Sequence, residues 1–155
     1  MNIILQIILV SIAPIVELRG GIPLAIASGI SPISAFLICT IANIVIIPII
    51  FLFLATINLL LLKIPGYSTF FHRTIERSRK KIHNSIEKYG YLGLAIFVSI
   101  PLPFTGAYTG VLGAWALGMN KTKSFASIAL GVIIAGIIVT LVSYYGINAL
   151  NIFLK

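Results

Sequence analysis

The stretch PIVELRGGIPLA, residues 14–25, interrupts an apolar N-terminal region with two opposite charges and two adjacent glycines. The runs on either side, residues 1–13 and 22–30, are each about half as long as a membrane-spanning helix. A charged side chain in hydrocarbon costs at least about 2.5–3.5 kcal/mol, and irregular backbone at that depth is tolerated only against protein or a water-filled cavity. The stretch therefore predicts a break between two short helices that faces the interior of a membrane protein.

The composition of the chain agrees with a membrane setting. Of the 155 residues, 59% are hydrophobic and 9% are charged, and the mean hydropathy is +1.14. Soluble domains contain about 25% charged residues, and a core of this size cannot hide so much apolar surface from water. We therefore expect an all-α integral membrane protein with a single membrane domain, residues 1–155.

Two uncharged segments, residues 33–62 and 124–154, are each longer than the roughly 20 residues that a membrane-spanning helix needs. Two shorter apolar runs, 91–100 and 107–118, flank a second break with the sequence PLPFTGAYTG, residues 101–110. The order of short helix, break, short helix and long span therefore occurs twice.

Matching positions in the two halves have a nearly constant separation. Pro14 and Pro101 are 87 residues apart, whereas Gly29 and Gly118 are 89 apart. Because few residues are identical, the pattern of lengths is the stronger indication of a weak internal repeat.

The two pairs of short helices, residues 1–30 and 91–118, admit two topologies. Each pair is either a re-entrant hairpin or one kinked span. The loop 63–90 contains seven of the eleven Lys and Arg residues, which indicates the cytoplasmic side. Only re-entrant hairpins keep Lys121 and Lys123 on that side too, so we expect hairpins. The repeats are then inverted, as in many transporters, in a multi-pass protein of the plasma membrane.

The basic loop predicts an amphipathic helix over residues 67–89. Phe71, Ile75, Ile82, Ile86 and Tyr89 share one helical face, and the cations lie largely on the rest. Such a helix lies in the membrane interface near anionic lipid head groups. It is either a topological anchor or a gate that collects an anionic lipid substrate. Because the positive charges are concentrated in this one loop, we expect no nucleic acid partner.

The first break supplies the charged candidates for a site. Glu17 is the only acid outside the basic loop, which makes it the candidate for proton coupling or for a cationic substrate. Gly20 and Gly21 permit sharp backbone, and Pro23 suits the first turn of the following helix. Free N–H groups at that helix start, together with Arg19, predict a phosphate or carboxylate site.

The second break has no charge but several polar groups. Thr105, Tyr108 and Thr109 offer hydroxyls, and Gly106 with Gly110 permits close helix packing. The candidate substrate- or ion-binding residues here and on the first span are Pro101, Pro103, Thr105, Gly106, Tyr108, Thr109 and Asn43. Asn43 fits either this site or a helix-packing hydrogen bond. No cluster has nucleophile or metal-ligand spacing, so we expect no enzyme, no metal and no cofactor.

Together, PIVELRGGIPLA and PLPFTGAYTG in a chain of this length resemble the putative small multidrug export protein family, which is similar to the DedA (SNARE-associated/VTT) membrane proteins. The resemblance covers nearly the whole chain and implies multipass export of small molecules. The likeness to DedA implies two re-entrant hairpins, ion-coupled transport of a lipid phosphate such as polyprenyl phosphate, and Glu17 as the acidic hairpin residue. Second hairpins of that type usually contain arginines, whereas residues 101–110 contain none.

The leading hypothesis is a proton- or ion-coupled transporter or flippase with its site between the two hairpins. Glu17 would take the proton or cation, and Arg19 would bind an anionic group of a lipid phosphate or small amphiphile. One alternative is an exporter of small cationic drugs, which would need Glu17 more than Arg19. The other is a non-transporting scaffold in which Glu17 and Arg19 form a structural ion pair. The sequence is also compatible with a homo-oligomer.

Overall fold

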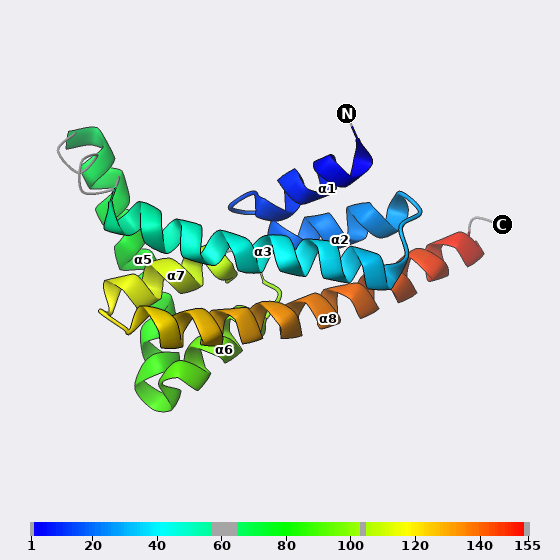
Figure 1. Ribbon diagram of the computed structural model, residues 1–155. Coiled ribbons are helices and arrows are strands. Elements are labelled where there is room, and N and C mark those ends of the chain that lie inside the picture. The colour runs from blue at the N-terminus through cyan, green and yellow to red at the C-terminus, as the bar shows by residue number, and fades with distance from the viewer. Residues whose placement is uncertain (1, 57–64, 103–104, 154–155) are drawn as a thin grey trace.

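The computed structural model describes residues 2–56, 65–102 and 105–153, which form seven α-helices and no strand (Figure 1). The all-α prediction is therefore confirmed for this part of the chain. The helices are α1 (Ile3–Ile12), α2 (Glu17–Ala27), α3 (Pro32–Ala55), α5 (Pro65–Tyr89), α6 (Tyr91–Ser99), α7 (Ala107–Ala116) and α8 (Lys121–Phe153).

Helices α3 and α8 are the two long apolar helices, and they pack side by side in opposite directions (Figure 1). Pro32–Ala55 and Lys121–Gly146 are long and apolar enough to cross a membrane. Only 33% of the most apolar 18-residue stretch of each helix is buried within the protein. Large apolar side chains such as Leu52 and Val142 point outward. This exposed apolar surface fits a lipid environment. Of the predicted spans, residues 57–62 and 154 lie outside the described residues.

The short helices form two pairs whose bends meet near the middle of the molecule. In the first pair, α1 runs inward and α2 runs back to the same end, joined by residues 13–16 (Figure 1). In the second pair, α6 comes from the other end and α7 returns there, joined by residues 100–106. Ala13 and Ile100 have extended backbone, because each precedes a proline that disfavours helical geometry at the preceding residue.

The first break lies earlier in the chain than predicted. We expected irregular backbone over Glu17–Gly21, but α2 begins at Glu17 and contains Gly20, Gly21 and Pro23 in its interior. The glycines serve close packing instead of a sharp turn. A Cβ added to Gly21 would overlap the Ser11 hydroxyl of α1. The expected place of Pro23 in the first turn was therefore wrong.

The ends of α2 and α7 have the same hydrogen-bond pattern at a constant separation. Both helices end on a glycine in the left-handed region, Gly29 with φ 84° and Gly118 with φ 64°, in the manner of a Schellman motif. The backbone hydrogen bonds of the first end all recur 89 residues later. The N–H groups of Ser28, Gly29 and Ile30 donate to the carbonyls of Leu24, Ile26 and Ala25, respectively. Those of Leu117, Gly118 and Met119 donate to the carbonyls of Gly113, Trp115 and Ala114.

The starts of the two long helices match as well. Ser31 accepts a hydrogen bond from the Ser34 N–H at the start of α3, and Asn120 accepts one from the Lys123 N–H at the start of α8. Side-chain oxygens of this kind satisfy the free N–H groups of a first helical turn. The local geometry of α2–α3 is thus repeated in α7–α8.

Helix α5 lies across one end of the molecule, away from both termini (Figure 1), and packs on α6 and α7. Phe71 is buried and Ile75 and Ile86 are partly buried, whereas Arg73 and Arg77 are exposed. The helix is therefore amphipathic, as its sequence pattern predicts, although Tyr89 at its end is exposed.

Candidate functional site

Glu17 of the first pair binds the start of α7 in the second pair. Its carboxylate accepts the N–H groups of Ala107 and Tyr108, each at 3.3 Å, and its side chain is only 4% exposed. The first N–H groups of a helix have no partner within the helix, and the helix dipole favours a negative charge there. Glu17 therefore caps α7 from the opposite pair.

The backbone of Glu17 is itself unusual. Its φ of 50° is the one positive value among the non-glycine residues that the structure describes. L-residues adopt this left-handed region at an energetic cost, and such residues concentrate at ligand and switch sites. The cap on α7 is thus held by a locally unfavourable conformation.

Arg19 also reaches the second pair. Its guanidinium Nη2 donates to the Thr105 hydroxyl at 3.0 Å and to the Ile100 carbonyl at 3.5 Å. Among the residues that the structure describes, its buried Nε has no hydrogen-bond partner, so the guanidinium keeps an unused donor at the meeting point of the two bends.

The direct ion pair between Glu17 and Arg19, one of the alternatives raised by the sequence, is not formed within 4.0 Å. Residues two apart do not face one another on a helix, and both lie in the first turn of α2. Each side chain instead bonds to a different part of the second pair. The charges therefore hold the two pairs together and do not simply neutralise each other in one contact.

Gly106 provides the space for the Glu17 carboxyl group. A Cβ at this position would overlap both oxygens of that group. Gly106 follows Glu17 by 89 residues, the same separation as the matching helix ends. The two residues are therefore equivalent positions of the two halves, and the Glu17 side chain occupies the space that a side chain at position 106 would need. Gly110, in contrast, serves helix packing, because a Cβ there would lie 2.8 Å from Val98.

Tyr108 makes the reciprocal contact from the second pair to the first. Its hydroxyl donates to the carbonyl of Ile12, the last residue of α1. Tyr108 follows Arg19 by 89 residues, so the two side chains occupy equivalent positions in the two halves. Arg19 bonds to the carbonyl that follows α6, and Tyr108 bonds to the last carbonyl of α1. The two bends are tied from both sides.

Asn43 of α3 is fully buried and connects a different pair of elements. Its amide nitrogen donates to the carbonyls of Ser11 at 2.9 Å and Cys39 at 3.0 Å. No described contact joins it to Glu17 or Arg19. Asn43 thus makes a helix-packing hydrogen bond between α3 and α1.

The remaining predicted residues lie near the bends. Pro101 follows the end of α6, and Thr109 lies in the first turn of α7, whereas Pro103 lies outside the described residues. The backbone groups of Ile12, Ile100 and Ala107 were not predicted from the sequence, because main-chain atoms leave no signal in the residue type. Within the described part of the chain, no group of three His, Cys, Asp or Glu residues could hold a metal ion.

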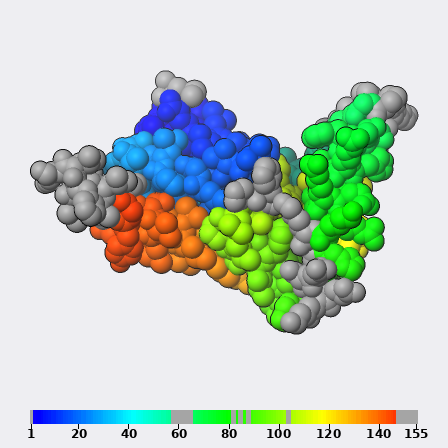
Figure 2. Space-filling model, turned by 180° about the vertical axis from the view of Figure 1, so that it is seen from behind, coloured from blue at the N-terminus to red at the C-terminus, as the bar shows by residue number. Residues whose placement is uncertain are grey.

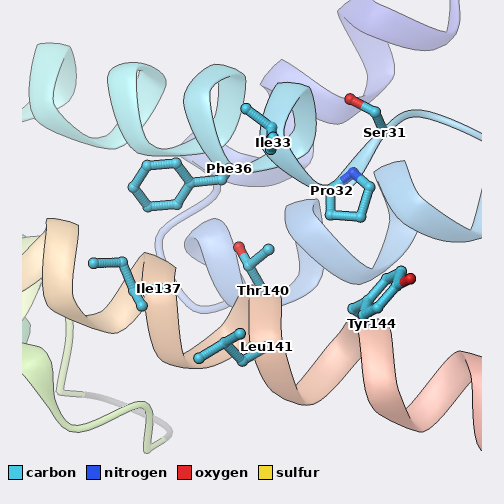
Figure 3. A pocket seen from close by; sticks show the side chains of 8 residues that line it. All are labelled: Ser31, Pro32, Ile33, Phe36, Ile137, Thr140, Leu141 and Tyr144. Carbon is cyan, nitrogen blue, oxygen red and sulfur yellow. The ribbon is translucent and has the colours of Figure 1, made fainter.

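A groove of about 480 Å³ lies between the start of α3 and the end of α8, at the end of the molecule away from α5 (Figure 3). Phe36 and Ile137 face it from the two helices, with hydroxyls from Ser31, Thr140 and Tyr144. No charged side chain lines it. This groove is therefore separate from the site formed by Glu17 and Arg19.

Comparison with known proteins gives one family. A family model described as "Putative small multi-drug export protein" matches residues 17–138, most of the chain, from Glu17 into α8. No curated protein matches the chain, and no solved structure does.

Proposed function

The chain belongs to the putative small multi-drug export protein family, and from this premise we propose that it is a transporter that moves a lipid phosphate or another small amphiphile across the membrane. The observation that carries the proposal is the position of Glu17 and Arg19. Ionisable groups inside a membrane protein are costly and mark substrate or proton pathways. Here both lie where the two bends meet, and both bond to the opposite pair.

We propose that the two helix pairs are re-entrant hairpins and that the halves form an inverted repeat. The opposite approach of the pairs to the middle of the molecule (Figure 1) and the matching hydrogen bonds at a separation of 89 residues support this arrangement. Inverted repeats with broken helices at the bilayer midplane are a common transporter architecture. The basic helix α5 then lies on the cytoplasmic side of the plasma membrane, within a single domain: hairpin 1–30, span 33–62, interfacial helix 67–89, hairpin 91–118 and span 124–154.

The proposed transport cycle uses the contacts between the bends as a closed gate. An anionic group needs hydrogen-bond donors, and the N-terminus of α7 and Arg19 supply them. Glu17 now occupies the α7 donors. When Glu17 takes up a proton it gives up its negative charge, and the anion of the substrate replaces it. Uptake of a proton and binding of the anion are coupled in this way.

A second candidate is the export of small lipophilic cations. The burial of Glu17, the one acidic side chain among the buried residues that the structure describes, and the description of the family favour it. A cation would pair with Glu17 directly, and Arg19 would then serve only to hold the second pair in place.

The two candidates are separated by transport into and out of proteoliposomes. Flipping of a polyprenyl phosphate and efflux of a lipophilic cation are measured for wild type, Glu17→Gln, Arg19→Gln and the double variant. Glu76→Gln and Arg73→Gln remove the same charges from exposed positions of α5 and serve as matched controls. Loss of flipping in either single variant supports the lipid phosphate, and efflux that needs Glu17 alone supports the cation. No transport of either substrate by the folded wild type would reject both candidates and favour a scaffold.

A further inference from the structure

Two hollows adjoin beneath α5, beside the meeting bends. One has a volume of about 530 Å³ and is lined by α5, by Pro14 and Ile15 of the first bend, and by the start of α7. The other, about 500 Å³, lies between α3, α5 and α7. Both are lined by Phe70, Thr74 and Tyr108, so they are neighbouring parts of one depression. Figure 2 shows the surface indented between α5 and the rest of the molecule.

The two parts differ in chemistry. The first is lined by Arg77, which is the only charged residue among its lining residues, and by the hydroxyl-bearing residues Ser78 and Thr109. Within the described part of the chain, no hydrogen bond or ion pair engages the side chain of Arg77, Ser78 or Thr109, and the acid nearest in sequence, Glu76, pairs with Lys80 at 3.9 Å. The first part therefore offers unused donors and one positive charge.

The second part is apolar. Most of its lining side chains are aliphatic or aromatic, including Ile46, Ile50, Phe53 and Phe71. Ile49 and Phe53 also belong to the exposed apolar surface of α3, so this part borders the surface that faces lipid. A molecule that enters from the membrane can place its chain here without crossing polar surface.

We propose that this depression binds a membrane amphiphile with a phosphate head group. The head group lies at Arg77, Ser78 and Thr109, and the chain lies between α3 and α5. A phosphate has several acceptor oxygens, which match a guanidinium with neighbouring hydroxyls. Tyr108 lines both parts, and its N–H binds Glu17 of the proposed gate. Because Thr109 directly follows Tyr108, the bound head group lies next to that gate. The inference deepens the proposed function and rests on it for its role in transport.

Trp115 is the single tryptophan of the chain and reports on this site. Its ring packs edge-on against Phe71 at a centroid distance of 5.8 Å, and Phe71 lines the apolar part. The experiment measures quenching of Trp115 fluorescence in phosphatidylcholine vesicles that contain either dibrominated phosphatidic acid or dibrominated phosphatidylcholine. We expect an apparent preference of about tenfold for the phosphatidic acid, the effect of one charge-assisted contact.

Two variants test the assignment. Arg77→Gln should abolish the preference, whereas Arg73→Gln, which removes an equal charge one turn away on the same helix outside the depression, should retain it. Thr74→Phe fills the junction of the two parts and should reduce quenching by both brominated lipids. Equal quenching by the two lipids in wild type, or equal loss in both arginine variants, would overturn the proposal, because a diffuse attraction of α5 for anionic lipid would then explain the result.

The source of the phosphate is tested by adding inorganic phosphate to the same vesicles. An unchanged preference supports a lipid ligand, whereas complete competition would overturn the amphiphile in favour of free phosphate. Because fluorescence measures binding alone, its result is independent of the transport assay. A preference for phosphatidic acid without flipping would support the binding site but reject the proposed function. Flipping without that preference would reject only the binding site.

Discussion

At the scale of single residues, the cap that the first pair places on α7 depends on one side chain and on the absence of another. The Glu17 carboxylate reaches the N–H groups of α7 only because Gly106 has no Cβ in its path. Gly106 has a φ of −102° and a ψ of −156°, which any residue adopts, so backbone conformation does not demand a glycine there. Its role is to leave space.

Gly106→Ala should therefore weaken both stability and transport. The methyl group displaces the Glu17 carboxyl, which then loses two buried hydrogen bonds, at a cost of about 1–3 kcal/mol. Thermal unfolding in detergent and the flipping assay measure the two effects. Gly66→Ala, at a position with open space around it, is the matched control. A Gly106→Ala protein as stable and active as wild type would show that the Glu17 cap is dispensable.

Asn43→Leu distinguishes a packing residue from a substrate ligand. The change keeps the volume but removes the bonds to Ser11 and Cys39. We expect a loss of stability of about 0.6–2 kcal/mol, the range for interhelical hydrogen bonds in membranes, with unchanged transport per folded protein. Thr140→Val, which removes a bond to the Gly136 carbonyl within α8 itself, should have a smaller effect. Lost transport at unchanged stability would instead place Asn43 in the substrate pathway.

At the scale of the elements, small residues decide how closely the helices approach. Helix α8 packs against α6 through Gly131, where an added Cβ would lie 2.6 Å from the Ala95 carbonyl oxygen and 2.7 Å from the Val98 Cβ. Contacts of this kind between backbones are the usual basis of helix association in lipid, where no hydrophobic force drives helices together. The second pair is therefore held on α8 by shape.

Gly131→Ala should separate α6 from α8. Because the new methyl meets backbone and a Cβ that cannot rotate away, we expect a destabilisation of about 1–3 kcal/mol. Gly146→Ala on the same helix has open space around it and should be neutral or slightly stabilising. Unfolding of both variants in the same detergent gives the comparison, and equal stabilities would mean that α6 and α8 tolerate a wider spacing.

At the scale of the whole molecule, the two helix pairs approach each other from opposite ends. This arrangement predicts on which side of the membrane each connecting loop lies. Ser28 lies just after α2, and Asn120 lies just before α8, both exposed. If the pairs are re-entrant hairpins, these two positions lie on opposite sides of the membrane. If each pair is one kinked span, they lie on the same side.

Single cysteines at Ser28 and Asn120, in a Cys39→Ala background, are labelled with a membrane-impermeant thiol reagent in intact cells and in inverted vesicles. We expect Ser28→Cys to react only from outside and Asn120→Cys only from the cytoplasmic side, together with Lys80→Cys on the basic helix. Labelling of Ser28→Cys and Asn120→Cys from the same side would reject the hairpins and with them the inverted repeat.

Features that depend on local chemistry could be predicted from the residues alone. Hydropathy and length predicted the helical class and the two long apolar helices, and the spacing of apolar residues predicted the amphipathic α5. Prolines marked both bends, because proline restricts the residue before it wherever it occurs. The matching glycines after α2 and α7 were visible as a weak repeat, since a left-handed helix end favours glycine in any context.

The partners of the charged residues, in contrast, depend on the packing of the helices. Glu17 bonds to α7 and not to Arg19, the paired glycines of the first break lie inside a helix, and Gly106 makes room for a carboxyl group 89 positions away. These contacts join residues far apart in the chain, largely through main-chain N–H and carbonyl groups that every residue has. Their pairing depends on how the two bends meet in space, which the order of the residues does not display.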